Sequence, residues 1–216
     1  MDEQSSAARG AVGAMGWERP AWLDRSTLDS VHELNEQALE LMRVQFLGGS
    51  EQSAFTAAVG QRLIGLDATT LQRAAGCGVL LVDAAFADGR FWLDSVVGAV
   101  NDRQRRVPAP FFTVDGTVTM VRQVLMQAWH LARSQPTAGR LLLGLSEINL
   151  GVIGGCTLNR LTRLADASAP WLRPRWESRP KIWRDLLQLA ATGSPESMER
   201  MRMRGLQLLA ADARQG

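Results

Sequence analysis

The sequence pattern repeats after 90 residues, without a gap, over two stretches that cover residues 27–86 and 117–176. Thr27 falls on Thr117 in this alignment. The aligned apolar pairs include Val31 with Val121, Leu34 with Val124, Ala38 with Ala128, Leu63 with Ile153, Leu71 with Leu161, Leu81 with Trp171 and Phe86 with Trp176. A repeat of this length indicates that one supersecondary unit occurs twice. We therefore expect two tandem, similar units that pack together as a pseudo-dimer.

The apolar periodicity within each unit is helical. Apolar residues recur every three or four positions over residues 28–42, while carboxylates occupy the opposite face, and Gly48-Gly49 ends the pattern. Further helices are expected at residues 50–59, 68–75, 90–100, 118–134, 139–144, 146–153, 157–168, 181–191 and 195–211. Residues 79–86 are expected to form a helical turn or an irregular core segment, with a short strand as the alternative. The simplest fold class is all-α.

Composition divides the chain into four parts. Residues 1–20 are rich in Ser, Ala and Gly and are expected to be disordered. The first helical unit then covers residues 21–100. Residues 101–110 contain three arginines and two prolines and form the best candidate linker. The second helical unit, with the C-terminal helices, covers residues 111–216.

The charge of the chain differs between its halves. Lys181 is the only lysine, and the other 23 basic residues are arginines. Residues 1–108 carry a net charge of −4, whereas residues 109–216 carry +6. This polarity permits an anionic partner for the second half without requiring one.

Neither a membrane span nor a redox motif is visible. No apolar run approaches the roughly 18 residues that a membrane helix needs, and residues 1–16 lack the basic and apolar segments of a secretory signal. Cys77 and Cys156 belong to no CxxC pair and lie among small apolar residues, which is typical of buried free thiols. We expect a cytoplasmic protein without a membrane partner.

No combination of residues predicts catalysis. His32 and His130 lie inside helices, and neither has a nucleophile or an acid at a motif spacing. The carboxylates of Glu33, Glu36 and Glu40 share a helix face but lack the Glu-x-x-His partner of di-iron bundles, so a solvated acidic face is expected. We expect no catalytic residues, no metal site and no cofactor, and therefore no enzyme.

The best candidate for nucleic-acid contact lies in the second unit. Residues 146–153, the turn Gly154-Gly155-Cys156 and residues 157–168 have the proportions of a helix-turn-helix. The second helix of that motif presents polar residues near its start to the major groove. Those residues are Thr157, Asn159, Arg160 and Arg163. The alternative is an ordinary helix pair, because glycine turns are common in all-α proteins.

A second candidate surface follows at residues 171–183. Arg173, Arg175, Arg179 and Lys181 alternate there with Trp171, Trp176 and Trp183. Such alternation can hold phosphates while bases stack. The alternative is that the tryptophans anchor the core and the arginine stems cover them. The repeat favours this alternative, because Trp171 and Trp176 align with the apolar residues Leu81 and Phe86. The three arginines of this segment remain candidates for an anionic or protein partner.

The second unit resembles FlhD, the subunit of the bacterial flagellar master transcription regulator that lacks the zinc site. The similar segment begins with Leu143-Gly-Leu-Ser-Glu147, includes Leu164-Ala165-Asp166 and reaches the aromatic Trp176. Residues 32–42 are similar to the opening helix of the family. The first unit departs from the pattern at residues 56–60, and neither cysteine falls where the family can link its dimers.

The resemblance implies a function. FlhD is an all-helical dimer that works with a zinc-binding partner, FlhC, at promoters, and two copies in one chain would form a covalent pseudo-dimer. We expect a non-enzymatic transcriptional regulator, or a subunit of one, that acts through DNA, through an FlhC-like or other regulator protein, or through both. The sequence also permits a homo-oligomer. The alternative is a helical adaptor that binds a regulatory or secretion partner without DNA contact.

Overall fold

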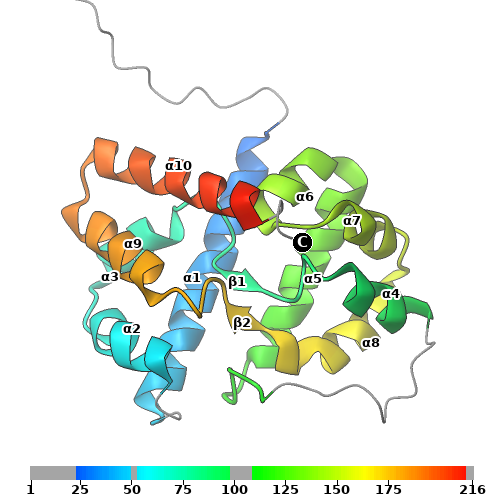
Figure 1. Ribbon diagram of the computed structural model, residues 1–216, viewed down its shortest axis with the longest axis horizontal. Helices are drawn as coiled ribbons and strands as arrows, with labels where there is room; N and C mark the ends of the chain where they lie inside the picture. The colour runs from blue at the N-terminus through cyan, green and yellow to red at the C-terminus, as the bar shows by residue number, and fades with distance from the viewer. Residues whose placement is uncertain (1–22, 50–52, 98–108, 213–216) are drawn as a thin grey trace, which may run out of the picture.

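A computed structural model describes residues 23–49, 53–97 and 109–212 of the protein. Within these ranges the fold consists of ten α-helices, a short 3-10 helix and one pair of two-residue strands, which confirms the predicted all-α class (Figure 1). The helices are α1 (Arg25–Leu47), α2 (Ala54–Ile64), α3 (Ala68–Ala75), α4 (Gly89–Val97), α5 (Thr117–Ser134), α6 (Pro136–Leu143), α7 (Glu147–Gly154), α8 (Leu158–Ser168), α9 (Pro180–Thr192) and α10 (Pro195–Asp212). The predicted disordered segment 1–20 and most of the predicted linker, residues 101–108, lie outside the described residues.

Side-chain caps fix where several helices begin. Ser53, Asp67, Ser146 and Thr157 each accept the backbone N–H three residues ahead, at the starts of α2, α3, α7 and α8. These bonds satisfy donors that a first helical turn otherwise leaves without a partner. The N–H of Thr70 also lowers the pKa of Asp67 by stabilising its carboxylate. The Ser53 cap explains why α2 begins at Ala54, and the helix continues to Ile64, so the predicted bounds 50–59 were wrong at both ends.

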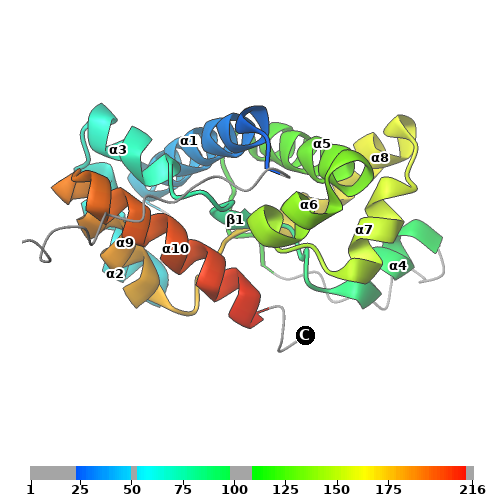
Figure 2. The same cartoon turned by 90° about the horizontal axis from the view of Figure 1, so that it is seen from above.

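The two long helices, α1 and α5, run antiparallel and touch along their buried faces. The N–H of Thr113, just before α5, donates to Oε1 of Gln45 near the end of α1 (2.9 Å). At the other end, Nε2 of Gln135, just after α5, donates to Oδ2 of Asp24 (2.8 Å). Figure 2 shows both helices along one face of the molecule, with most other helices on the opposite side.

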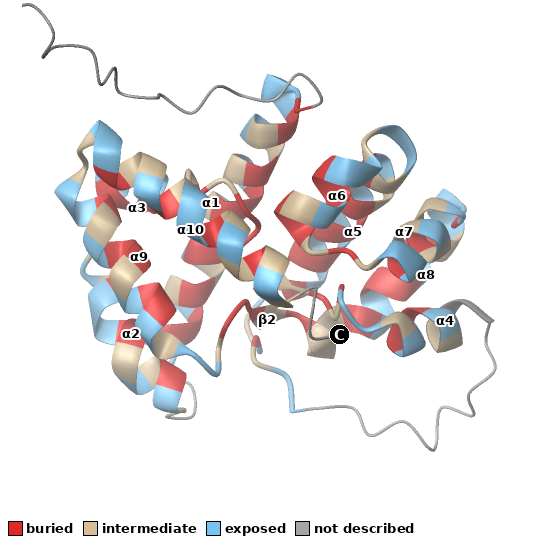
Figure 3. Ribbon diagram, turned by 45° about the horizontal axis from the view of Figure 1, so that its top comes forward, coloured by how far each residue is buried: buried red, intermediate tan, exposed pale blue. Residues whose placement is uncertain are grey.

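The faces that these helices turn inward are those that the periodicity predicted. The buried positions include Val31, Leu34, Ala38 and Met42 of α1 and Val121, Val124, Ala128 and Leu131 of α5. The buried residues lie on the sides of the helices that meet, as Figure 3 shows in red. Carboxylates of α1 such as Glu33 and Glu40 remain exposed. Burial of these apolar faces stabilises the fold by about 25 cal/mol per Å² removed from water.

The remaining helices form two lobes that exchange elements. In one lobe α1, α2 and α3 are joined by α9 and α10, and in the other α5, α6, α7 and α8 are joined by α4 (Figure 1). Phe55 of α2 and Trp183 of α9 meet edge to face, with ring centroids 5.6 Å apart. The lobes therefore differ from the predicted sequence units 21–100 and 111–216. The lobe of α1 contains α9 and α10 from the second unit, and the lobe of α5 contains α4 from the first unit.

Two short strands cross between the lobes. Strand β1 (Val82–Asp83) pairs antiparallel with β2 (Arg173–Pro174), with Val82 opposite Pro174 and Asp83 opposite Arg173. The N–H of Arg175 extends the pairing to the carbonyl of Leu81 (2.8 Å). Residues 79–86 thus form an irregular core segment, as predicted, that contains a two-residue strand in place of a helical turn.

Matching landmarks of the two units are 90 residues apart at first and 91 residues apart later. The N-caps Asp67 and Thr157 differ by 90. Ala85 and Trp176, which both have φ of 57°, differ by 91. The 3-10 helix η1 (Ala169–Trp171) lies between these points. This spacing matches Leu81 with the fully buried Leu172 in place of Trp171. The duplication itself stays a prediction.

Candidate DNA-binding and partner-binding surfaces

Helix α8 is held in place by α5. Its buried residues are Leu161, Leu164, Ala165 and Ser168. The turn before α8 is fixed by Trp129, whose indole N–H donates to the carbonyl of Cys156 (2.9 Å). Nη2 of Arg122 on α5 and Oδ1 of Asp166 form an ion pair at 2.7 Å. The position of α8 is therefore determined by α5 on both the apolar and the polar side.

The predicted helix-turn-helix is present in its proportions only. Helix α7 ends at Gly154, three residues follow, and α8 begins at Leu158. Both helices pack extensively on α5, however, and make few contacts with each other. The turn connects two separate supports of α5, so its length does not identify a DNA-binding motif.

Four predicted site residues lie together at the start of α8. Thr157, Asn159 and Arg163 are exposed, and Arg160 is half-buried. Residues three and four apart share a helix face, so Arg163 lies on the same side of α8 as Asn159 and Arg160. Within the described part of the chain, no carboxylate lies within 4.0 Å of the guanidinium groups of Arg160 and Arg163. Both arginines are thus available to an anion.

The half-buried Arg173 and the exposed Arg179 already have partners. Nη1 of Arg173 and Oε2 of Glu177 are 2.6 Å apart, and Nη2 of Arg173 donates to the carbonyl of Ala109 (2.7 Å). Nη2 of Arg179 donates to both carboxylate oxygens of Asp212, at 2.7 and 2.9 Å. Arg173 belongs to β2, and Arg179 directly precedes α9. The structure therefore divides the predicted site among α8, the strand pair and the start of α9.

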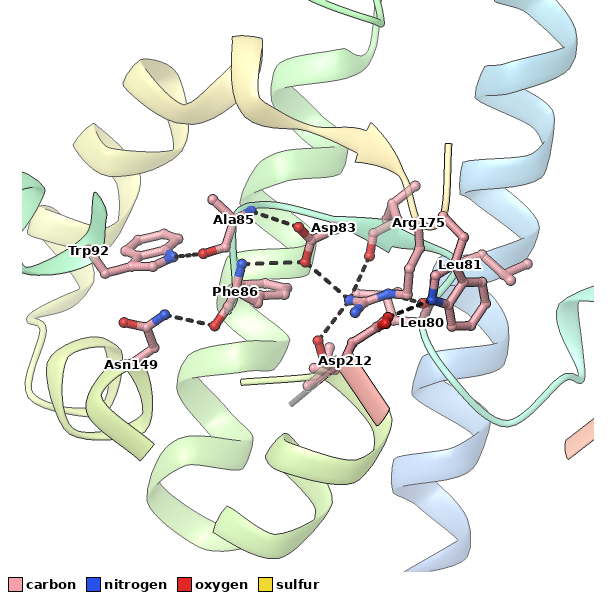
Figure 4. Close-up of polar contacts among 12 residues, drawn as sticks. Leu80, Leu81, Asp83, Ala85, Phe86, Trp92, Asn149, Arg175 and Asp212 are labelled. Atoms are coloured by element: carbon pink, nitrogen blue, oxygen red, sulfur yellow. Dashed lines mark hydrogen bonds and ion pairs between the residues drawn. The ribbon is translucent and has the colours of Figure 1, made fainter. Parts of the chain in front are cut away.

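The assignment of Arg175 to a binding surface was wrong, because Arg175 is buried at 7% exposure. The acceptors of its guanidinium are Leu80 O (2.9 Å), Leu143 O (2.8 Å), Val82 O (3.2 Å) and Oδ1 of Asp83 (3.3 Å) (Figure 4). Burial lowers the pKa of Arg175, while Asp83 opposes this effect. The side chain joins the strand β1 of one unit to the end of α6 of the other.

Polar contacts continue from Arg175 into the second lobe (Figure 4). Asp83 accepts the N–H groups of Ala85 (3.2 Å) and Phe86 (3.3 Å). The carbonyl of Phe86 then accepts Nδ2 of the buried Asn149 on α7 (2.7 Å). Such contacts satisfy the backbone of the segment that crosses between the lobes, which is a structural role.

The structure contains a basic groove that was not predicted from the sequence. A concavity of about 510 Å³ lies where α2, α9 and α10 meet, and its basic lining residues are Arg179, Lys181, Arg184 and Arg204. Arg204 forms an ion pair with Asp185 (2.8 Å). Lys181 and Arg184 are exposed and have no carboxylate within 4.0 Å among the described residues. The basic residues near 180 were visible in the sequence, whereas the approach of Arg204 depends on the fold.

The described residues offer no group of three or more His, Cys, Asp or Glu side chains that could hold a metal ion. Nε2 of His32 contacts Oε1 of Glu36 at 3.1 Å, and His130 is exposed. None of the described helices combines the length and the apolar character that a membrane crossing requires.

Comparison with known proteins adds no relative. No family model, no curated protein and no solved structure matches the chain. The resemblance to FlhD thus rests on the residues quoted above and stays a prediction.

Proposed function

We propose that the protein is a non-enzymatic transcriptional regulator, or a subunit of one, that resembles FlhD and acts as a dimer fused into a single chain. The observation that carries this proposal is the reciprocal packing of the two units. Helix α4 of the first unit packs on α7 of the second, and α9 of the second packs on α2 of the first. Because their landmarks are about 90 residues apart, we interpret these two contacts as equivalent.

The contacts between the long helices support the same arrangement. Gln45 and Gln135 are 90 residues apart, and each bonds to the segment that precedes the long helix of the other unit. A two-fold axis between identical subunits makes every contact occur twice in this way. The arrangement agrees with the dimer that the FlhD resemblance implies.

The DNA contact of this regulator is assigned to the first turns of α8. Arginine and asparagine side chains contact phosphates and base edges. Asn159, Arg160 and Arg163 combine these side chains on one exposed helix face without a carboxylate to neutralise the arginines. Other arginines of the predicted site are paired or buried, which makes the α8 face the better candidate.

A salt titration with DNA tests this assignment. A fluorescent duplex of roughly 40 base pairs is titrated with the purified protein between about 50 and 200 mM salt. The expected slope of log K against log salt is about −0.9 for each phosphate contact. The double variant R160E/R163E should lose binding and reduce this slope. The control R90E/R140E changes the net charge equally at exposed positions on α4 and α6 and should bind like the wild type.

Equal loss of binding in both double variants would show that only net charge matters and would reject the α8 face. An FlhC-like partner, added to the same assay, should raise the affinity if the chain is a subunit. Absence of DNA binding with and without a regulator partner would favour the adaptor alternative. A shallow groove between α1 and α5, lined in part by Gln37, Gln123 and the exposed Met126, offers such an adaptor a place for a partner.

A further inference from the structure

A cavity of about 290 Å³ lies where the start of α1, the segment after α3, α6 and α10 meet. Its lining residues come from both lobes, since α6 belongs to the lobe of α5 and the other three elements to the lobe of α1. Its volume is near the lower end of pockets that hold small molecules, about 300–1,000 Å³. The size suits a compact ligand and excludes a macromolecule from its interior.

The walls of this cavity are aliphatic. Leu28 of α1, Leu141 and Leu142 of α6 and Leu206 of α10 line it. Leu142 is 1% exposed and forms part of the core, while the other three are only partly buried. An apolar ligand would remove the exposed parts of these three side chains from water, with a gain of about 25 cal/mol per Å².

The rim of the cavity is positively charged. Arg25 and Arg202 both line it, and Asp29 supplies one opposing charge, so the formal charges of these three residues sum to +1. The Nε of Arg202 donates to the carbonyl of Gly76 (3.3 Å), which holds the guanidinium at the cavity. Among the described residues neither arginine has a carboxylate within 4.0 Å.

The aliphatic part of the Arg202 side chain also packs closely against the backbone of Gly78. Gly78 has φ of +80°, and a Cβ at this position would lie 3.3 Å from Cγ of Arg202. The side chain is half-buried, which increases the strength of a charge-assisted hydrogen bond relative to one in water. The cavity therefore combines aliphatic walls with one positioned guanidinium.

We propose that this cavity binds a small monocarboxylate with an aliphatic tail, of the size of octanoate. The tail would contact the leucines, and the carboxylate would accept hydrogen bonds from Arg202, with Arg25 adding to the field. A ligand in this place would contact both lobes and stabilise their arrangement, because binding to the folded state alone raises stability. The proposal does not depend on DNA binding.

Isothermal titration calorimetry with sodium octanoate tests the site. The wild type should bind octanoate, and R202Q should weaken binding by about tenfold or more through loss of the ionic contact. Octanol lacks the carboxylate, so it should bind the wild type and R202Q equally. R200Q removes a neighbouring arginine of α10 that does not line the cavity and should behave as the wild type.

A second variant addresses the walls. L206W fills the cavity and should abolish binding of both octanoate and octanol, while circular dichroism shows that the helices remain folded. Absence of octanoate binding to the wild type would overturn the proposal. Equal octanoate affinity in the wild type and R202Q, or unchanged binding to folded L206W, would overturn it as well.

Discussion

The indole N–H groups of Trp92 and Trp183 make equivalent hydrogen bonds in opposite lobes of the molecule. Trp92 donates to the carbonyl of Ala85 (3.0 Å), and Trp183 donates to the carbonyl of Arg175 (2.6 Å). Both rings are fully buried, and the two residues are 91 positions apart. Each bond connects the first helix after a unit's strand, α4 or α9, to the segment that follows that strand, at the point where the chain crosses to the other lobe.

The first prediction concerns these two bonds. Trp92→Phe and Trp183→Phe keep most of the ring packing but each removes one hydrogen bond. The carbonyl of Arg175 then has no other donor among the described residues, whereas the carbonyl of Ala85 keeps the N–H of Asp88 (3.0 Å). Trp183→Phe should lower the free energy of unfolding by about 1–3 kcal/mol and Trp92→Phe by about 0.5–1.5 kcal/mol. Urea unfolding followed by circular dichroism measures the effect. A loss in one variant only would contradict the equivalence of the two sites.

The second prediction concerns Arg175. Arg175→Met preserves a long side chain but removes every donor to the carbonyls of Leu80, Val82 and Leu143 and to Asp83. Breaking a buried ionic contact typically costs about 3–5 kcal/mol. The matched control Arg173→Met removes a partly exposed pair with Glu177 and should cost less than about 1 kcal/mol. Similar melting temperatures for the two variants would show that Arg175 does not hold the lobes together.

The burial of Arg175 shows what the sequence could and could not predict. The start of α3 was predictable because its cap, Asp67, is adjacent to the helix it begins. The burial of Arg175 was not predictable, because the residues next to it in the sequence do not distinguish it from Arg173 and Arg179. Its acceptors at residues 80, 82 and 143 come from distant parts of the chain. The exchange of α4 and α9 between lobes has the same origin, because periodicity defines the apolar face of a helix but not its partner.

The third prediction concerns alkaline pH. Burial raises the pKa of Cys77 to about 11, against 9.0 for an unperturbed thiol. Above pH 9 the unfolded chain releases this proton while the folded chain retains it, so stability falls as pH rises. Between pH 9 and 11 the loss should approach about 2–3 kcal/mol.

The matched variant for this titration is Cys77→Ala. It should start less stable because of the space it leaves, yet lose less stability between pH 9 and 11. Burial also raises the pKa of Cys156, which keeps its own contribution in both proteins. Urea midpoints at several pH values give the two slopes. Parallel slopes would mean that Cys77 ionises equally in the folded and unfolded chain.

The fourth prediction compares two glycines at which replacement by alanine should change the stability of the protein in opposite directions. Gly144 ends α6 with φ of +70°, and a Cβ there would lie 2.7 Å from Nη1 of Arg175. Gly144→Ala should therefore destabilise the protein by at least about 1–2 kcal/mol, the cost of the left-handed conformation alone. Gly151 lies in α7, where a Cβ would meet nothing within 4 Å. Gly151→Ala should stabilise the protein by about 0.5–1 kcal/mol, since alanine loses less backbone freedom in a helix. Thermal unfolding of both variants measures the difference, and a destabilised Gly151→Ala would contradict the exposed position of this side of α7.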